Sequence, residues 1–321
     1  MGKKRTRAQR RARARVRRRR AIVVVATVAL GLVAFVAYRG MAKSAAVPSA
    51  TGGQAIDPAV FASGACVAFP PTSGDRHETV FLDAGHGGID PGGVGTTESG
   101  RSIDEAAETL PVELDVMALL RADGFRVVVS RTSNSTVVKL TPADVTQGTF
   151  TLLGAHDDVA ARDVCANDAG ARVLVGIYFD AGSSPDNAGS VSAYDPDRPF
   201  SSANQQLATL VQHDVLARLD AEGWNIPDDG VQSDDQLGSL NGNPATGGLA
   251  GAAAAYQHLL LLGPADPGYF TTPSLMPGTV IEPLYITDPF EGSIAASAKG
   301  QAVMARGIAA AVERFLGPHS S

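Results

Sequence analysis

The stretch "FLDAGHGGIDPGGVG", residues 81–95, decides the fold, because it has the pattern of a buried strand that ends in a functional loop. Residues 79–85 form a short apolar run that closes with Asp83 and a glycine, which predicts a strand and then a turn. The glycines around His86 let the backbone turn sharply and leave the imidazole uncovered. His86 is therefore a candidate metal ligand, and Asp83 a candidate residue for orienting a ligand. The spacing leaves open a glycine-rich turn with an incidental histidine.

Outward from this stretch, short apolar runs alternate with helical patterns. We expect helices over 103–125, 156–171, 201–223 and 292–316, and further strands over 126–131, 172–182, 190–196, 257–263 and 278–286. This alternation predicts a single α/β domain with a mostly parallel central sheet flanked by helices. Ligands of such sheets gather beyond the carboxyl ends of the strands. The polar, glycine-rich segment 225–254 is expected to be a loop beside that site.

Charge divides the chain into two unlike parts. Residues 1–20 contain 12 Lys and Arg and no acid, whereas residues 45–321 contain 13 basic and 33 acidic residues, a net charge of −20. The acidic part argues against a nucleic-acid partner. Residues 21–38 carry no charge and would span about 27 Å as a helix, close to the thickness of a bilayer core. The chain thus resembles a single-pass cell-membrane protein with a cytoplasmic N-terminus and an extracytoplasmic domain. A cleaved signal peptide and secretion are the alternative.

The predicted organisation has five parts. They are a basic cytoplasmic tail (1–20), a transmembrane anchor (21–38), a flexible tether (39–65), a globular domain (66–317) and a short tail (318–321). Cys66 and Cys165 are the only cysteines, and outside the cytoplasm they are expected to form a disulfide. Two buried free thiols are the alternative.

Four blocks resemble the zinc-dependent N-acetylmuramoyl-L-alanine amidases, which cut the amide between N-acetylmuramic acid and L-alanine in peptidoglycan. The blocks are "FLDAGHGGIDPGGVG" (81–95), "GFRVVVSRTSNS" (124–135), "ARDVCANDAGARVLVGIYFDAG" (161–182) and "VIEPLYITDPFEGSIAASAKGQAVMARGI" (280–308). They occur in the family's order and together span about residues 79–316. The resemblance implies a hydrolase whose zinc activates water and whose substrate is peptidoglycan.

The resemblance also implies roles for particular residues. His86 takes the position of the first zinc ligand, Glu105 that of the glutamate ligand, and Glu282 that of the catalytic base. Glu108 is the near alternative to Glu105, and Glu98 and Glu113 are weaker ones. A zinc ion with three protein ligands keeps one position open for water, whose pKa the metal lowers.

This sequence departs from the family at the second histidine, where Tyr178 stands in "VGIYFD" (175–180). A phenol has a pKa near 10 and does not normally replace imidazole on zinc. His156 is a possible substitute ligand, while His213 and His258 are interpreted as structural or surface residues. The two functional hypotheses are therefore a peptidoglycan amidase and an impaired amidase-fold protein. The second would bind peptidoglycan or regulate another cell-wall hydrolase, and we expect a cell-wall regulatory protein as its partner.

Overall fold

The computed structural model describes residues 52–236, 252–253 and 255–317. The predicted tail and anchor lie outside these residues, as do most of the tether and the final tail. Among the helices that are described, none has the length and apolar character needed to cross a membrane.

An eight-stranded sheet with the order β1-β2-β6-β3-β9-β12-β10-β11 forms the centre of the domain. Its strands are β1 (Gln54–Ala55), β2 (Ala65–Phe69), β3 (Thr79–Ala84), β6 (Arg126–Arg131), β9 (Val173–Ile177), β10 (Ser190–Tyr194), β11 (Asp228–Ser233) and β12 (Gly278–Glu282). The four central strands, β6, β3, β9 and β12, are parallel to one another. β10 is antiparallel to β12, and β11 runs parallel to β10. The mostly parallel α/β sheet expected from the sequence is thus confirmed.

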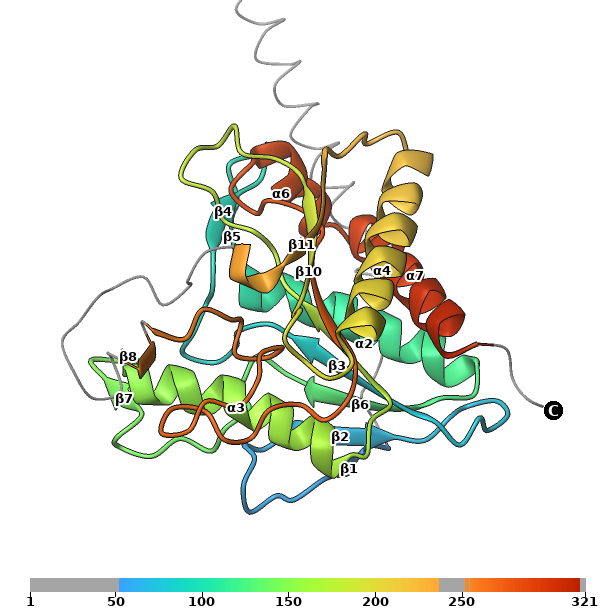
Figure 1. Cartoon of the computed structure of the whole chain (residues 1–321). Helices are drawn as coiled ribbons and strands as arrows, with labels where there is room; N and C mark the ends of the chain where they lie inside the picture. The colour runs from blue at the N-terminus through green and yellow to red at the C-terminus, as the bar shows by residue number, and fades with distance from the viewer. Residues whose placement is uncertain (1–51, 237–251, 254, 318–321) are drawn as a thin grey trace, which may run out of the picture. The chain divides into compact units, whose positions relative to one another are not determined.

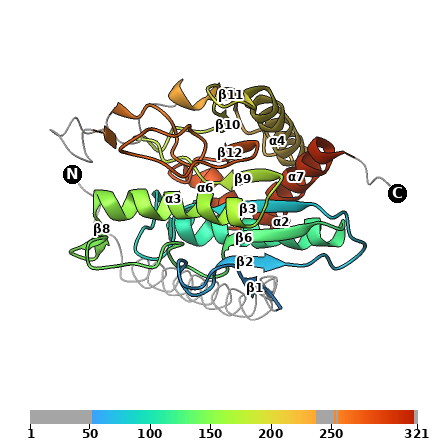
Figure 2. The same cartoon turned by 60° about the horizontal axis from the view of Figure 1, so that its bottom comes forward.

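Different helices cover the two faces of the sheet (Figures 1 and 2). Alternating side chains of each strand point to opposite faces and pack against these helices. In β3, Val80 and Leu82 join the core shared with α2 (Glu105–Ala122), α4 (Ser201–Ala221) and α7 (Ala298–Leu316). Phe81 joins the second core, which includes residues of α3 (Leu152–Asp168). Near-continuous apolar strands are expected for a sheet that is covered on both faces.

A disulfide joins the sheet to the helix on this second face. Cys66 of β2 and Cys165 of α3 are bridged, with their Cα atoms 5.7 Å apart. The packed domain begins before Cys66, because β1 pairs with β2 and Phe61 is only 2% exposed. The tether predicted for 39–65 therefore extends too far towards the domain.

Several short elements lie outside the eight-stranded sheet and the long helices. They are the hairpins β4 (Val94–Thr96) with β5 (Ser102–Asp104) and β7 (Val145–Thr146) with β8 (Thr149–Phe150), the 3-10 turn η1 (Asp234–Gln236), and α6 (Pro289–Ala295).

Three expectations about local structure were wrong. Residues 257–263 form turns, closed by hydrogen bonds from the Leu262 and Gly263 amides to the Leu259 carbonyl. Their apolar side chains are buried as loop residues and not in a strand. The segment 225–254 contains a strand, β11, and the predicted helix 292–316 is broken where Ser297 caps α7. An apolar segment is expected to be buried, but it can be buried as a strand, a helix or a turn, so apolar content alone does not predict the backbone conformation.

Candidate active site

The candidate residues meet at the edge where the parallel strands end. His86 lies in the loop after β3, Tyr178 follows β9 directly, and Glu282 is the last residue of β12. Glu105 is the first residue of α2, where the N-cap Asp104 accepts a 2.9 Å hydrogen bond from the Ala107 amide. A carboxylate at a helix N-terminus is favoured by the helix dipole. Strand pairing thus assembles residues that are far apart in the sequence.

His86 is held between two carboxylates. Its Nδ1 lies 2.7 Å from Asp90 Oδ2, and its Nε2 lies 3.2 Å from Glu105 Oε2. Burial alone would lower the pKa of His86, but the hydrogen bonds to Asp90 and Glu105 outweigh it and raise the pKa to about 10. Glu105 is oriented in turn by the backbone amides of Gly93 and Phe179, each 2.9 Å away. His86 is therefore held between two carboxylates that favour its protonated form.

Tyr178 does not point its hydroxyl at His86 and Glu105. The hydroxyl donates a 3.0 Å hydrogen bond to Asp83, and the ring lies edge-on to His86 with centroids 5.4 Å apart. Asp83 is also paired with the buried Arg162, whose guanidinium reaches Asp158 at 2.8 Å. The ring covers Gly85 so closely that a Cβ there would lie 2.4 Å from it. Tyr178 is thus built into a buried charge network beneath the loop.

This arrangement supplies two of the three zinc ligands that the family resemblance implies. Donor atoms on a tetrahedral zinc ion lie about 3.3 Å apart, so the 3.2 Å between His86 Nε2 and Glu105 Oε2 suits two of them. Burial and the nearby Asp83 hold the pKa of Tyr178 well above its usual value, so the phenol stays protonated. Its hydroxyl is already committed to Asp83. The residues present therefore do not fit the three-ligand zinc site.

Glu282 stands at the same edge with Asp180 and Tyr285. Burial raises the pKa of Glu282 to about 8, with further contributions from Asp180 and Glu105. The loops after β9 and β12 are tied together, because the Asp180 amide donates to the Leu284 carbonyl at 3.0 Å. Because its pKa lies near 8, the Glu282 carboxyl is largely protonated at neutral pH.

The other candidate residues lie away from this group. Glu108 accepts a 3.0 Å hydrogen bond from Gln301 and pairs with Arg101 at 3.6 Å. His156 lies 2.9 Å from Asp157 and packs against Tyr269. Glu113 lies beneath the loop, where Oε1 accepts a 3.0 Å hydrogen bond from the Ala84 amide. Of the acidic candidates in α2, Glu105 alone contacts His86.

Several residues that shape the site were not assigned roles from the sequence. Asp90 and Arg162 are described above, and Arg131 is the third. The Arg131 guanidinium is fully buried and donates to the backbone carbonyls of Gly85 at 3.1 Å and Ala106 at 2.7 Å. An arginine at the end of an apolar strand was the available signal, since a buried guanidinium needs several acceptors.

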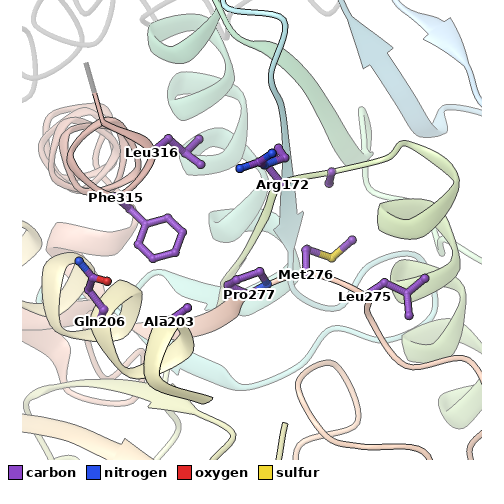
Figure 3. A pocket seen from close by; sticks show the side chains of 9 residues that line it. Arg172, Ala203, Gln206, Leu275, Met276, Pro277, Phe315 and Leu316 are labelled. Atoms are coloured by element: carbon purple, nitrogen blue, oxygen red, sulfur yellow. The ribbon is translucent and has the colours of Figure 1, made fainter. Parts of the chain in front are cut away.

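Two hollows lie at opposite edges of the sheet. One of about 320 Å³ adjoins the candidate site and is lined by Val94, Gly95, Thr96, Ser102, Gly182, Ser183, Ser184, Pro185 and Thr287. The other, of about 460 Å³, lies where β9 and β12 begin (Figure 3). Arg172 and Pro277, which line the larger hollow, directly precede these two strands. The smaller hollow is therefore the one on the same side of the sheet as His86 and Glu282.

Comparisons with known proteins agree with this architecture. The family model described as N-acetylmuramoyl-L-alanine amidase matches residues 80–314. A search of curated proteins finds no significant match.

Among solved structures, the chain is similar to the N-acetylmuramoyl-L-alanine amidase AmiC2 of Nostoc punctiforme, with 21% identity, a TM-score of 0.50, and coverage of 76% of this chain and 99% of that one. It is also similar to the CwlD amidase from Clostridioides difficile, solved in complex with the GerS lipoprotein, with 19% identity, a TM-score of 0.53, and coverage of 74% and 98%. At these identities the similarity shows the fold.

Proposed function

The chain belongs to the N-acetylmuramoyl-L-alanine amidase family, and we propose that it acts on peptidoglycan at the amide between N-acetylmuramic acid and the L-alanine of the stem peptide. One observation carries the proposal: His86, Glu105 and Glu282 converge at a single sheet edge beside a hollow of about 320 Å³. Ligands of open α/β sheets bind at this edge.

In this proposal Glu282 handles the proton. A carboxyl with a pKa of about 8 can donate a proton to the leaving amine, and its ionised fraction can accept one from water. Asp90 and Glu105 hold the His86 ring in position. The 182–185 loop and Thr287 line the hollow and would contact the glycan or the stem peptide. Zinc is left out of these steps because the third ligand is missing.

A second function, peptidoglycan binding without cleavage, is favoured by the hydrogen bond from Tyr178 to Asp83. That contact commits the residue in place of the second histidine to the protein interior. Such a protein would bind the wall or regulate another hydrolase. One relative of this fold, CwlD, was solved with a lipoprotein, and by analogy we propose that a cell-wall regulatory protein is a possible partner here. The apolar stretch 21–38 would hold the domain at the outer face of the cell membrane.

Digestion of purified peptidoglycan by the full-length protein tests the two functions. Hydrolysis releases stem peptides with a free N-terminal L-alanine, which mass spectrometry detects. Glu282→Gln should lower the rate by about 100-fold or more, since general acid–base groups contribute roughly 10²–10⁴. The matched control is Glu98→Gln, an exposed glutamate whose backbone amide bonds to Ser293. Co-sedimentation with peptidoglycan but no released peptide, with or without added zinc, would rule out the amidase and leave the binding function.

A further inference from the structure

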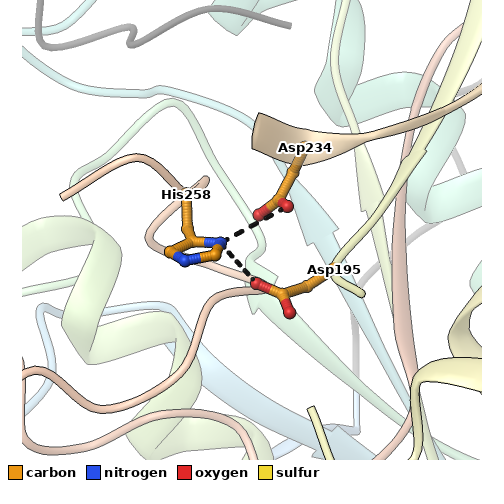
Figure 4. Close-up of side chains that lie close together, drawn as sticks. All are labelled: Asp195, Asp234 and His258. Atoms are coloured by element: carbon orange, nitrogen blue, oxygen red, sulfur yellow. Dashed lines mark ion pairs between the residues drawn. The ribbon is translucent and has the colours of Figure 1, made fainter. Parts of the chain in front are cut away.

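A second group of ligand-type side chains lies at the opposite edge of the sheet. Asp195 directly follows β10 and Asp234 directly follows β11. The two strands are parallel and pair Tyr194 with Ser233, so the two aspartates emerge side by side. The 256–263 loop brings His258 to face both of them (Figure 4).

Three atoms of this group converge on one point. His258 Nδ1 lies 2.9 Å from Asp195 Oδ2 and 3.5 Å from Asp234 Oδ1, and all three atoms lie within 4.8 Å of one another. Donor atoms on a tetrahedral zinc ion are about 3.3 Å apart, so the two separations from His258 Nδ1 suit such a ligand set.

The remaining atoms of the two carboxylates are fixed by the backbone. Asp195 Oδ1 accepts a 2.6 Å hydrogen bond from the Asp197 amide, and Asp234 Oδ2 accepts a 3.0 Å bond from the Leu259 amide. The two aspartates are 0% and 1% exposed. Asp195 Oδ2, Asp234 Oδ1 and His258 Nδ1 make no hydrogen bond of good geometry to any described residue. The protein thus brings together three buried donor atoms whose contacts, among the described residues, are with one another.

Charge around the group is also unbalanced. Two adjacent buried carboxylates are costly unless a cation compensates them. Within the described part of the chain, no lysine or arginine forms an ion pair with Asp195 or Asp234. The nearby Arg198 donates instead to the carbonyls of Leu262 and Gly263, at 2.9 and 2.8 Å. A single proton on His258 Nδ1 can hydrogen-bond well to only one of the two carboxylates.

We propose that Asp195, Asp234 and His258 form a divalent-cation site of the zinc type, separate from the active-site edge. His258 Nε2 lies 3.7 Å from Asp197 Oδ2, which gives the histidine the carboxylate neighbour common among zinc-bound imidazoles. Asp195 lies level with the beginning of β12 and Glu282 at its end, about 13 Å away along the strand. The site is therefore structural: the cation joins the ends of β10 and β11 to the 256–263 loop.

Zinc binding to the full-length protein tests this site. His86→Ala first disables the pair at the active-site edge. After equilibrium dialysis against Zn²⁺, the His86→Ala protein should retain about one zinc per chain, and His86→Ala with Asp234→Asn should retain at least tenfold less. The control is His86→Ala with His213→Gln, because His213 makes a 2.9 Å contact with Asp214 like that of His258 but has a 70% exposed side chain. The control should keep its zinc.

Two results of the dialysis would overturn the proposal: no zinc in the His86→Ala protein, or equal zinc with and without Asp234→Asn. Equal zinc in the two proteins would mean that a proton shared among the three side chains, and not a metal ion, compensates the charge of the two carboxylates. Thermal unfolding guards against a misfolded variant. Zinc should raise the melting temperature of the His86→Ala protein, and a melting temperature independent of zinc would also reject the site.

Discussion

The two sheet edges carry similar acidic and histidine side chains, but the charge of their buried carboxylates is neutralised in different ways. At the active-site edge Asp83 and Asp158 are paired with Arg162, and His86 lies between Asp90 and Glu105. At the opposite edge Asp195 and Asp234 share only His258. The edge whose carboxylates form ion pairs with arginine needs no metal to balance them, and the edge whose carboxylates have only a histidine presents three donor atoms to a cation. Acidic and histidine content alone would not separate the two.

The largest effect is expected from removing the cation of the active-site edge. Arg162→Ala leaves the buried carboxylates of Asp83 and Asp158 without their cation, and should cost about 3–5 kcal/mol in the free energy of unfolding. Denaturant unfolding measures this loss. Arg314→Ala breaks an ion pair with Asp214 whose arginine is 52% exposed, and should cost less than about 1 kcal/mol. Equal losses would mean that Arg162 does not hold this edge together.

The next effect concerns the missing ligand. Tyr178→His should raise the zinc affinity of the active-site edge by about 100-fold or more, because even an outer neighbour of a ligand is worth roughly 10–100-fold. The measurement is calorimetric titration with Zn²⁺ in the Asp234→Asn background, which removes the second site. Tyr178→Phe is the control, since it loses the hydrogen bond to Asp83 without adding a ligand. If Tyr178→His has no higher zinc affinity than the wild type, the residue at position 178 is not what limits zinc binding at this edge.

Measured per pH unit, the smallest effect is a slope in stability from Glu113, a carboxylate beneath the active-site edge. Burial raises its pKa to about 8 in the folded protein, against 4.5 for an ordinary glutamate. Between these values the folded chain holds a proton that the unfolded chain has lost. Glu113 therefore makes stability fall as pH rises from about 4.5 to about 8, by at most about 1.4 kcal/mol per pH unit.

Glu113→Gln should flatten this part of the curve of stability against pH, because glutamine does not titrate. The glutamine oxygen can still accept hydrogen bonds from the Ala84 and Ser130 amides, so the local structure is kept. Unfolding measured at pH 5, 6.5 and 8 checks it. Glu98→Gln is the control and should leave the slope as in the wild type. An unchanged slope in Glu113→Gln would mean that Glu113 is ionised and balanced by Arg131.

Much of the fold could be read from local patterns. The strand at 126–131 was predicted with the bounds it has, and the strand at 79–85 to within one residue, because β-branched apolar runs bounded by turn residues are a local signal. The predictions of secondary structure were wrong where the amino-acid composition of a segment is compatible with several backbone conformations. The apolar segment 257–263 is buried as turns, and β11 lies in a polar segment whose strand character comes from pairing with β10.

The sequence by itself determined the α/β class, the family, and the set of residues that an amidase site would use. The family resemblance places Tyr178 at the position where such a site would have its second histidine. Only the tertiary structure decided what Tyr178 does instead, because its partner Asp83 lies 95 residues away and reaches it through strand pairing. The grouping of Asp195, Asp234 and His258 has the same origin. Sheet register brings the aspartates together and a loop adds the histidine, and no spacing along the chain encodes that meeting.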